Sequence, residues 1–237
     1  MFALPDGLPP GRFQLHEATP VWLSDTRPAP PLPLAPGLVA LLCHPYALGG
    51  PVEFAHLPLE ETLAEAFTAY RRERLPLWTN PDPHPAPEDI EPWPHDPGPP
   101  FTTWPGLAPG TPALPAPPPP FPLTDPELAD TRLLLTPAPR PSEALARLGW
   151  TADVNLPLLC ALLHSWEDRF GARLVAVLGS ELHLTVERPP LDAESATLLA
   201  LEHALTGATS VVDDPPTPFP TYAADLPGRT TWSFWWD

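Results

Sequence analysis

The stretch that decides the fold is residues 155–188, NLPLLCALLHSWEDRFGARLVAVLGSELHLTVER. Asn155 is a good helix N-cap, and Pro157 falls in the first turn, where its missing N–H is not needed. Apolar residues then recur at steps of four, three and four, which indicates one helix face: Leu159, Leu163, Trp166 and Phe170. Gly171 is the residue type that ends helices. A capped amphipathic helix is therefore predicted between Asn155 and Gly171.

Two strands follow this helix, at residues 172–178 and 181–188, joined by the two-residue turn Gly179-Ser180. The turn sets the expected register on the apolar face. The pairs are Val177 with Leu182, Val175 with Leu184, and Arg173 with Val186. The first strand is apolar on both faces and the second alternates, so we expect the first near the sheet centre and the second near an edge. The apolar face should lie against helices.

Patterns on either side of the hairpin predict further elements. Helices are expected over residues 59–74, 142–148 and 193–206, the first of them ended by Pro76. Strands are expected over residues 38–43, 131–136 and 231–237. Together they predict an α+β fold: a small mixed or antiparallel sheet with a central hairpin, packed by two or three helices, plus a long proline-rich irregular insert.

Composition divides the chain of 237 residues into three parts. Prolines crowd residues 81–126, where they fix φ and remove backbone donors, so neither helix nor ladder can form there. We expect an N-terminal α/β segment at 1–80, a proline-rich linker or surface excursion at 81–126, and a C-terminal α+β domain at 127–237. Aromatic residues within the proline-rich part indicate that some of it lies on the folded body: Trp93, Phe101 and Trp104.

Charge excludes several classes of function. All 12 basic residues are arginine, so a phosphate-loop lysine, a Schiff base and a lysine general base are excluded. The formal net charge of −17 gives the surface a negative potential, which should repel nucleic acids and anionic membranes. The same potential favours a cationic protein partner.

The two cysteines, Cys43 and Cys160, each lie within an apolar run, so we expect buried free thiols instead of a disulfide framework. The N-terminus lacks a signal-peptide pattern, and no apolar run approaches the ~18 residues that a membrane span needs. These patterns predict a cytoplasmic location.

Polar side chains on the predicted helix and hairpin are the candidates for chemistry. His164, Glu167 and Asp168 lie at i, i+3 and i+4, so they share a helix surface that could bind a metal or transfer protons. One helix supplies too few ligands, so further side chains would have to converge with them: Glu181, His183 and Glu187 of the hairpin, or Glu202 and His203 of the next helix. Because a solvated polar face explains the same residues, no metal and no cofactor is assigned.

Candidate binding residues lie in the C-terminal half. In a terminal strand, Trp235 points away from the face that carries three core aromatics: Trp232, Phe234 and Trp236. The carboxylates of Asp237 stand close to Trp235. Glu181 on the hairpin and His203 on the following helix complete the set of candidate binding residues.

Several motifs in this half resemble a known family. They are LGW at residues 148–150, SWEDRFGARLV from Ser165, ELHLTVERPP from Glu181, and WSFWWD at residues 232–237. They are similar to the bacterial family catalogued as domain of unknown function 4253, over about residues 131–237. PVWLSD from Pro20 is similar more loosely, and the proline-rich insert is a departure. The resemblance implies a small α+β domain and brings no established activity, cofactor or catalytic residue.

Two functions are therefore open. The first is a non-enzymatic, acidic protein that binds another protein as an inhibitor or accessory factor; it rests on the charge, the absent catalytic signatures and the proline-rich excursion. The second is a metal-dependent or acid/base hydrolase-like enzyme that uses His164, Glu167, Asp168 and His183. The sequence favours the first.

Overall fold

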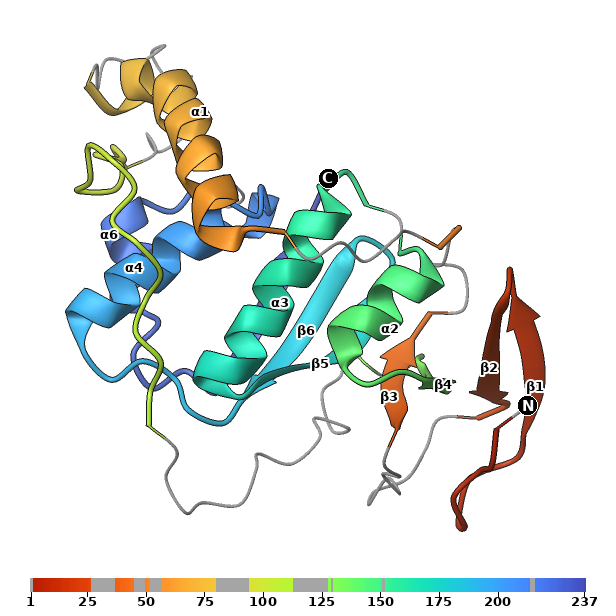
Figure 1. The fold of residues 1–237 in the computed structure, drawn as a ribbon. Helices are drawn as coiled ribbons and strands as arrows, with labels where there is room; N and C mark the ends of the chain where they lie inside the picture. Colours follow the sequence, from red (N-terminus) through yellow and green to blue (C-terminus); the bar gives the residue numbers. More distant parts are fainter. Residues whose placement is uncertain are drawn as a thin grey trace, which may run out of the picture.

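The computed structural model describes residues 2–26, 37–44, 50–51, 57–79, 94–112, 128, 130–150, 152–213 and 216–237. Its centre is one seven-stranded sheet, ordered β1-β2-β4-β3-β5-β6-β7 (Figure 1). Neighbouring strands run antiparallel, except that β3 and β5 are parallel. The strands are β1 Gly11–His16, β2 Thr19–Ser24, β3 Leu38–Cys43, β4 Arg132–Pro137, β5 Ala172–Leu178, β6 Glu181–Val186 and β7 Thr231–Trp235.

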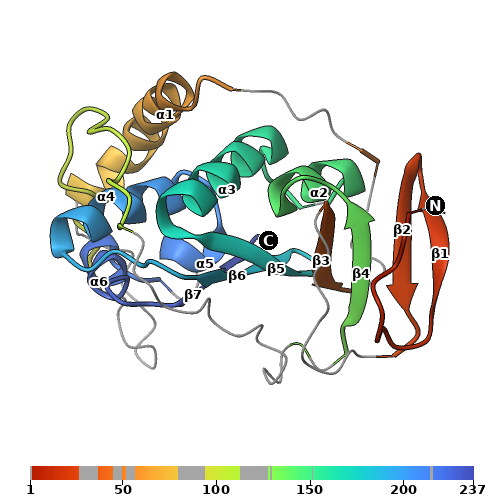
Figure 2. The same ribbon diagram turned by 60° about the horizontal axis from the view of Figure 1, so that its bottom comes forward.

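The structure combines helices with this mixed sheet, which confirms the predicted α+β class. The helices are α1 Leu59–Thr79, α2 Pro141–Leu148, α3 Leu156–Phe170, α4 Ala193–Ala204, α5 Thr209–Val212 and α6 Phe219–Ala224. Helices α2 and α3 lie over one face of the sheet, while β1 and β2 stand at one end of it (Figures 1 and 2). In the described part of the chain, no helix is long and apolar enough to cross a membrane.

Helix α3 has the predicted ends. The Asn155 side chain accepts a hydrogen bond from the Leu158 N–H at 3.2 Å, which satisfies one of the unpaired donors of the first turn. Gly171 follows the helix with φ at 60°, a conformation that glycine adopts without the steric cost of a Cβ. These local signals position α3 at the start of the hairpin.

Strands β5 and β6 form the predicted hairpin, but its register shifts once. The pair Val177–Leu182 beside the turn is confirmed. Farther from the turn, a β-bulge at Val175 moves the pairing by one residue, so Leu184 faces Leu174 instead of Val175. The expected pairing of Val175 with Leu184 is therefore wrong.

The bulge decides where Arg173 points. We expected Arg173 opposite Val186 on the apolar face, but it pairs with Thr185 and is exposed. Ala172 takes the position opposite Val186 and is buried. A guanidinium beneath the helices would lose its hydration, and the bulge avoids that cost by turning the side chain to solvent.

The aromatics of the C-terminal strand lie in the core, as predicted. Trp232, Phe234 and Trp236 are at most 2% exposed, whereas Trp235 alternates to the other face. The Trp166 ring of α3 stacks on Phe234 with centroids 5.5 Å apart and planes 13° apart. Large aromatic rings contribute most of the apolar area that such a core removes from water.

The N-terminal part of the chain contributes to the same sheet and core. Strands β1 to β3 adjoin β4 and β5, and Leu41 of β3 and Phe67 of α1 belong to the core cluster that holds Trp166 and Phe234. The described parts of the N-terminal and C-terminal halves thus contribute to one sheet and one core. The division of the chain into domains stays a prediction.

Helix α1 does not end before Pro76 as expected. It continues through Thr79, with Pro76 inside it. Contacts in the last turn account for the difference: the Thr79 hydroxyl donates to the Leu75 carbonyl at 2.8 Å, and Trp78 packs on Tyr70 with centroids 5.6 Å apart. Burial of Trp78 offsets the hydrogen bond that a proline removes from the helix.

Residues 94–112, here called the strap, lie across the folded body (Figures 1 and 2). Phe101 and Trp104 pack against the core, so the prediction for these two aromatics is confirmed. The indole N–H of Trp104 donates to a carboxylate oxygen of Glu60 at 2.8 Å. Trp93 and the rest of residues 81–126 lie outside the described residues.

Both thiols are expected to resist labelling in the folded protein. Cys43 and Cys160 are free and at most 1% exposed, and burial raises the pKa of each to about 12. Because the thiolate is the reactive form, a disulfide reagent at pH 8 should react only after the protein is unfolded in urea. Rapid release of the chromophore from native protein would contradict this expectation.

Candidate functional site

The three candidate residues of α3 lie together on its outer surface, within a network of ion pairs. Arg140 is the residue before α2. Its guanidinium nitrogen Nη1 lies 2.6 Å from Oδ1 of Asp168 and 3.8 Å from Oε2 of Glu167. Glu167 is also 3.8 Å from Arg173, and His164 is 3.8 Å from Asp168. Partial burial raises the pKa of Glu167, while Arg140 and Arg173 oppose that shift. Both acids are thus paired with arginine.

The fourth candidate, His183, lies on the opposite face of the sheet. Its neighbours Leu182 and Leu184 belong to the core beneath α3, and successive side chains of a strand point to opposite faces. The His183 ring contacts Glu181, with Nε2 2.9 Å from Oε1. The sheet therefore separates His183 from His164, and the four residues proposed for hydrolysis do not converge.

The candidate binding residues are divided in the same way. Glu181 is opposite Trp235 in the β6–β7 register, so these two side chains and His183 share the face away from α3. The Trp235 N–H donates to the Ser210 hydroxyl at 3.0 Å. Asp237 is exposed at the C-terminus.

His203 is instead buried on the α3 side, in a box of aromatic rings. Its ring centroid lies 4.7–4.9 Å from those of Trp166, Trp232 and Phe234. Its Nδ1 is 2.9 Å from the Tyr222 hydroxyl, and its side chain is 0% exposed. Burial lowers the pKa of His203 well below its ordinary value, with smaller contributions from Arg229 and Arg169. The imidazole is therefore neutral at physiological pH.

Glu202, the residue before His203, lies in a buried ion pair that we did not single out as such from the sequence. Its carboxylate is 0% exposed and receives two hydrogen bonds from the Arg169 guanidinium, at 2.5 and 2.9 Å. The Trp166 indole N–H and the Ala108 backbone N–H each donate to it at 2.8 Å. A carboxylate at an inner position of the apolar helix sequence LLALEHAL was the one signal that could have indicated a partner.

The ion pair between Arg169 and Glu202 binds the strap to the folded body. While Glu202 binds the Ala108 N–H, Arg169 donates to the Ala108 carbonyl at 2.7 Å, so both polar backbone groups of one strap residue are satisfied by one ion pair. The Thr111 N–H donates to the Arg169 carbonyl at 3.1 Å. The arrangement has a structural role: it holds an irregular segment without secondary structure.

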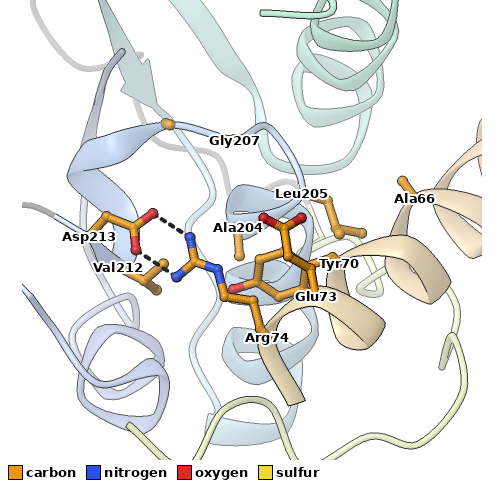
Figure 3. Close-up of a pocket in the computed structure, with 10 residues that line it drawn as sticks. Ala66, Tyr70, Glu73, Arg74, Ala204, Leu205, Gly207, Val212 and Asp213 are labelled. Carbon is orange, nitrogen blue, oxygen red and sulfur yellow. Dashed lines mark hydrogen bonds and ion pairs between the residues drawn. The ribbon is translucent and has the colours of Figure 1, made fainter. Parts of the chain in front are cut away.

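A pocket of about 290 Å³ lies between α1 and the turn that joins α4 to α5. Figure 3 shows Arg74 reaching from α1 toward Asp213, with Tyr70 and Glu73 beside it. The two guanidinium–carboxylate bonds measure 2.6 and 2.7 Å. Small apolar residues complete the lining, among them Ala66, Ala204, Ala208 and Val212.

A second hollow, of about 430 Å³, is here called the groove. The strap forms one wall with Pro97, Gly98, Pro99 and Pro100, while α4 and α6 form the other. Sequence reasoning missed both hollows, because each is lined by residues from elements that are far apart in the chain. Among the described residues, no group of three His, Cys, Asp or Glu side chains could hold a metal ion.

Residues 132–237 match the model of a family described as Domain of unknown function (DUF4253). The match confirms the resemblance that the motifs between LGW and WSFWWD indicate. Strands β1 to β3, helix α1 and the strap lie outside the matched residues. No curated protein and no solved structure matches the chain.

Proposed function

We propose that this protein is a non-enzymatic binding module that docks a cationic segment of a partner protein in the groove. The observation that carries the proposal is an apolar hollow of about 430 Å³ on a chain with a net charge of −17. Apolar hollows with polar rims are typical of binding sites.

The groove is lined mostly by apolar residues. Phe219 and Ala223 of α6 are buried in its wall, and Ala193 and Thr197 of α4 form one side. The strap wall is fixed by Asp96, whose carboxylate accepts hydrogen bonds from the Gly98 N–H at 2.9 Å and the Phe219 N–H at 2.8 Å. A pre-formed wall lowers the ordering cost of binding, because little has to be immobilised.

Acidic residues flank the groove along the chain. Exposed Asp192 and Glu194 adjoin the lining residue Ala193, and exposed Asp225 follows the lining residue Ala224. Hydrogen bonds from Ser195 lower the pKa of the Asp192 carboxyl, which keeps it ionised. Negative charge around an apolar hollow steers and holds an approaching segment that is basic and carries an apolar side chain.

Support for a non-enzymatic role comes from the candidate catalytic residues. The carboxylates of Glu167 and Asp168 form ion pairs with arginines, and the sheet separates His183 from them. A general base has to lie within hydrogen-bond reach of the proton that it abstracts, together with its partner groups. The four candidate residues, His164, Glu167, Asp168 and His183, do not surround one position where they could act on the same substrate.

A labelled peptide of alternating arginine and leucine tests the groove, with the glutamate–leucine peptide as its charge-reversed counterpart. We expect fluorescence anisotropy to show binding of the basic peptide only, weakened by salt. Thr197→Arg places bulk and positive charge in the groove and should weaken binding about tenfold or more.

Thr68→Arg is the matched control. Thr68 lies on α1 outside the groove, and both threonine hydroxyls donate to the carbonyl four residues earlier in their helix, at 2.8 and 2.7 Å. The two variants change the net charge equally, so equal losses of affinity would refute docking in the groove. Equal binding of the acidic peptide would refute the cationic partner.

A further inference from the structure

The pocket beside α1 is lined by residues of α1, of α4 and of the chain between Leu205 and Asp213 (Figure 3). Its volume of about 290 Å³ lies just below the usual range for ligand pockets, roughly 300–1,000 Å³, which favours a ligand of few atoms. Small side chains at Ala66, Ala204 and Ala208 line this space, and Val212 adds an apolar wall.

A fixed positive charge lies at the rim of the pocket. The Arg74 guanidinium donates through both terminal nitrogens to Asp213, at 2.6 and 2.7 Å, and it lies 5.6 Å from the centre of the Tyr70 ring. These bonds use two of the five N–H donors of a guanidinium. Within the described residues Arg74 makes no other hydrogen bond, so the ion pair orients the group while donors remain for a ligand.

Two negative charges accompany this positive one. Asp213 and Glu73 both line the pocket, and both raise the pKa of Arg74. A simple anion would bind Arg74 but would face two carboxylates, and a simple cation would face the guanidinium. A molecule that carries both signs satisfies all three groups, since its carboxylate meets donors and its ammonium meets acceptors.

We propose that this pocket binds a small zwitterion of the α-amino-acid type. The ligand carboxylate lies on Arg74, its ammonium lies toward Glu73 and Asp213, and its side chain lies on the apolar wall of Ala204 and Val212. Such a ligand has no net charge, so the strongly negative protein does not repel it as it would an anion. The site is separate from the groove and would act in addition to the proposed docking function.

Calorimetric titration of the full chain with α-amino acids from glycine to leucine tests the site. Leucinamide, which lacks the carboxylate, and N-acetyl-leucine, which lacks the ammonium, are the matched analogues. We expect one or more of the free amino acids to saturate the protein and each analogue of leucine to bind roughly tenfold more weakly than leucine. Leucinamide or N-acetyl-leucine binding as well as leucine would overturn the zwitterion assignment, and so would the absence of binding by every amino acid.

Substitutions of two arginines of α1, Arg74 and Arg71, test where on the protein the amino acid binds. Arg74→Gln should weaken amino-acid binding about tenfold, because it removes a charge-assisted hydrogen bond. Arg71→Gln changes the net charge equally, but Arg71 does not line the pocket, so affinity should stay at the wild-type value. Equal effects of the two substitutions would contradict the assignment. Ala66→Leu, which fills the pocket without changing its charge, should also reduce binding, and undiminished binding by that variant would place the ligand elsewhere.

Discussion

Glu202→Gln is expected to lower the free energy of unfolding by about 3–5 kcal/mol, the cost of removing one partner from a buried ion pair. The substitution leaves the shape of the side chain almost unchanged but removes the charge that balances Arg169, which is only 16% exposed. The amide also places an NH₂ group where the carboxylate accepts bonds from Trp166 and Ala108. Urea unfolding at pH 7 measures the difference.

Glu194→Gln on the same helix is the matched control. Glu194 is exposed, so its substitution should change the free energy of unfolding by less than about 0.5 kcal/mol. Hydrogen exchange adds a local readout, because loss of the Glu202 carboxylate should speed exchange of the Ala108 amide. Coincident unfolding curves for the two variants would show that the buried pair adds nothing to stability.

Local signals explain which parts of the fold could be predicted. The caps of α3 and the Gly179-Ser180 turn depend on residues within a few positions of one another, and the structure confirms both. The bulge at Val175 depends on which face the helices cover, so the turn alone could not predict it. We predicted that helix α1 would end before Pro76, because proline ordinarily ends a helix. The burial of Trp78 outweighed that local preference.

The buried ion pair shows why contacts distant in sequence escaped prediction. Arg169 and Glu202 are 33 positions apart, and the Ala108 N–H that completes the arrangement is 94 positions from Glu202. The aromatics of the strap indicated that it packs on the body, but nothing in the sequence named Glu60 as the partner of Trp104. Pairing over such distances depends on how the helices cross the sheet.

The arrangement of the candidate residues in space could be predicted in part. Helical spacing placed His164 and Asp168 on one surface, because three- and four-residue steps meet on a helix. The same alternation that puts Leu182 and Leu184 beneath the helices already implies that His183 points away from them. The pocket beside α1 and the groove could not be predicted from the sequence, since each is lined by residues from elements far apart in the chain.

Acidification below about pH 6.5 is expected to destabilise the protein by up to about 1.4 kcal/mol per pH unit through His203 alone. Burial is the main reason that the pKa of His203 in the folded state is far below its ordinary value, and the charges of Arg229 and Arg169 add to the effect. The Tyr222 hydroxyl faces the ring at 2.9 Å and offers no charge to compensate. Protonation would place a cation among aromatic rings, and no described residue forms an ion pair with it.

The direction of the pH effect on stability depends on whether the folded or the unfolded state binds more protons. In the unfolded chain His203 binds a proton near pH 6.5, whereas in the folded protein it stays neutral to much lower pH. Below pH 6.5 the unfolded state therefore binds more protons, and the free energy of unfolding falls as the pH falls. The loss ends only at the folded-state pKa, and above the unfolded-state pKa the residue adds no pH dependence.

His203→Phe separates this effect from the other titrating groups. The variant keeps an aromatic ring in the box but cannot titrate, and it leaves the Tyr222 hydroxyl without its partner, so it should be less stable than the wild type at pH 7.5. Between pH 6.5 and 5.5, however, the wild type should lose about 1 kcal/mol more than the variant, because the unfolded histidine is already half protonated at pH 6.5. The comparison uses the change with pH within each protein, so the fixed cost of the substitution cancels. Parallel pH profiles would mean that His203 gains its proton without leaving the core.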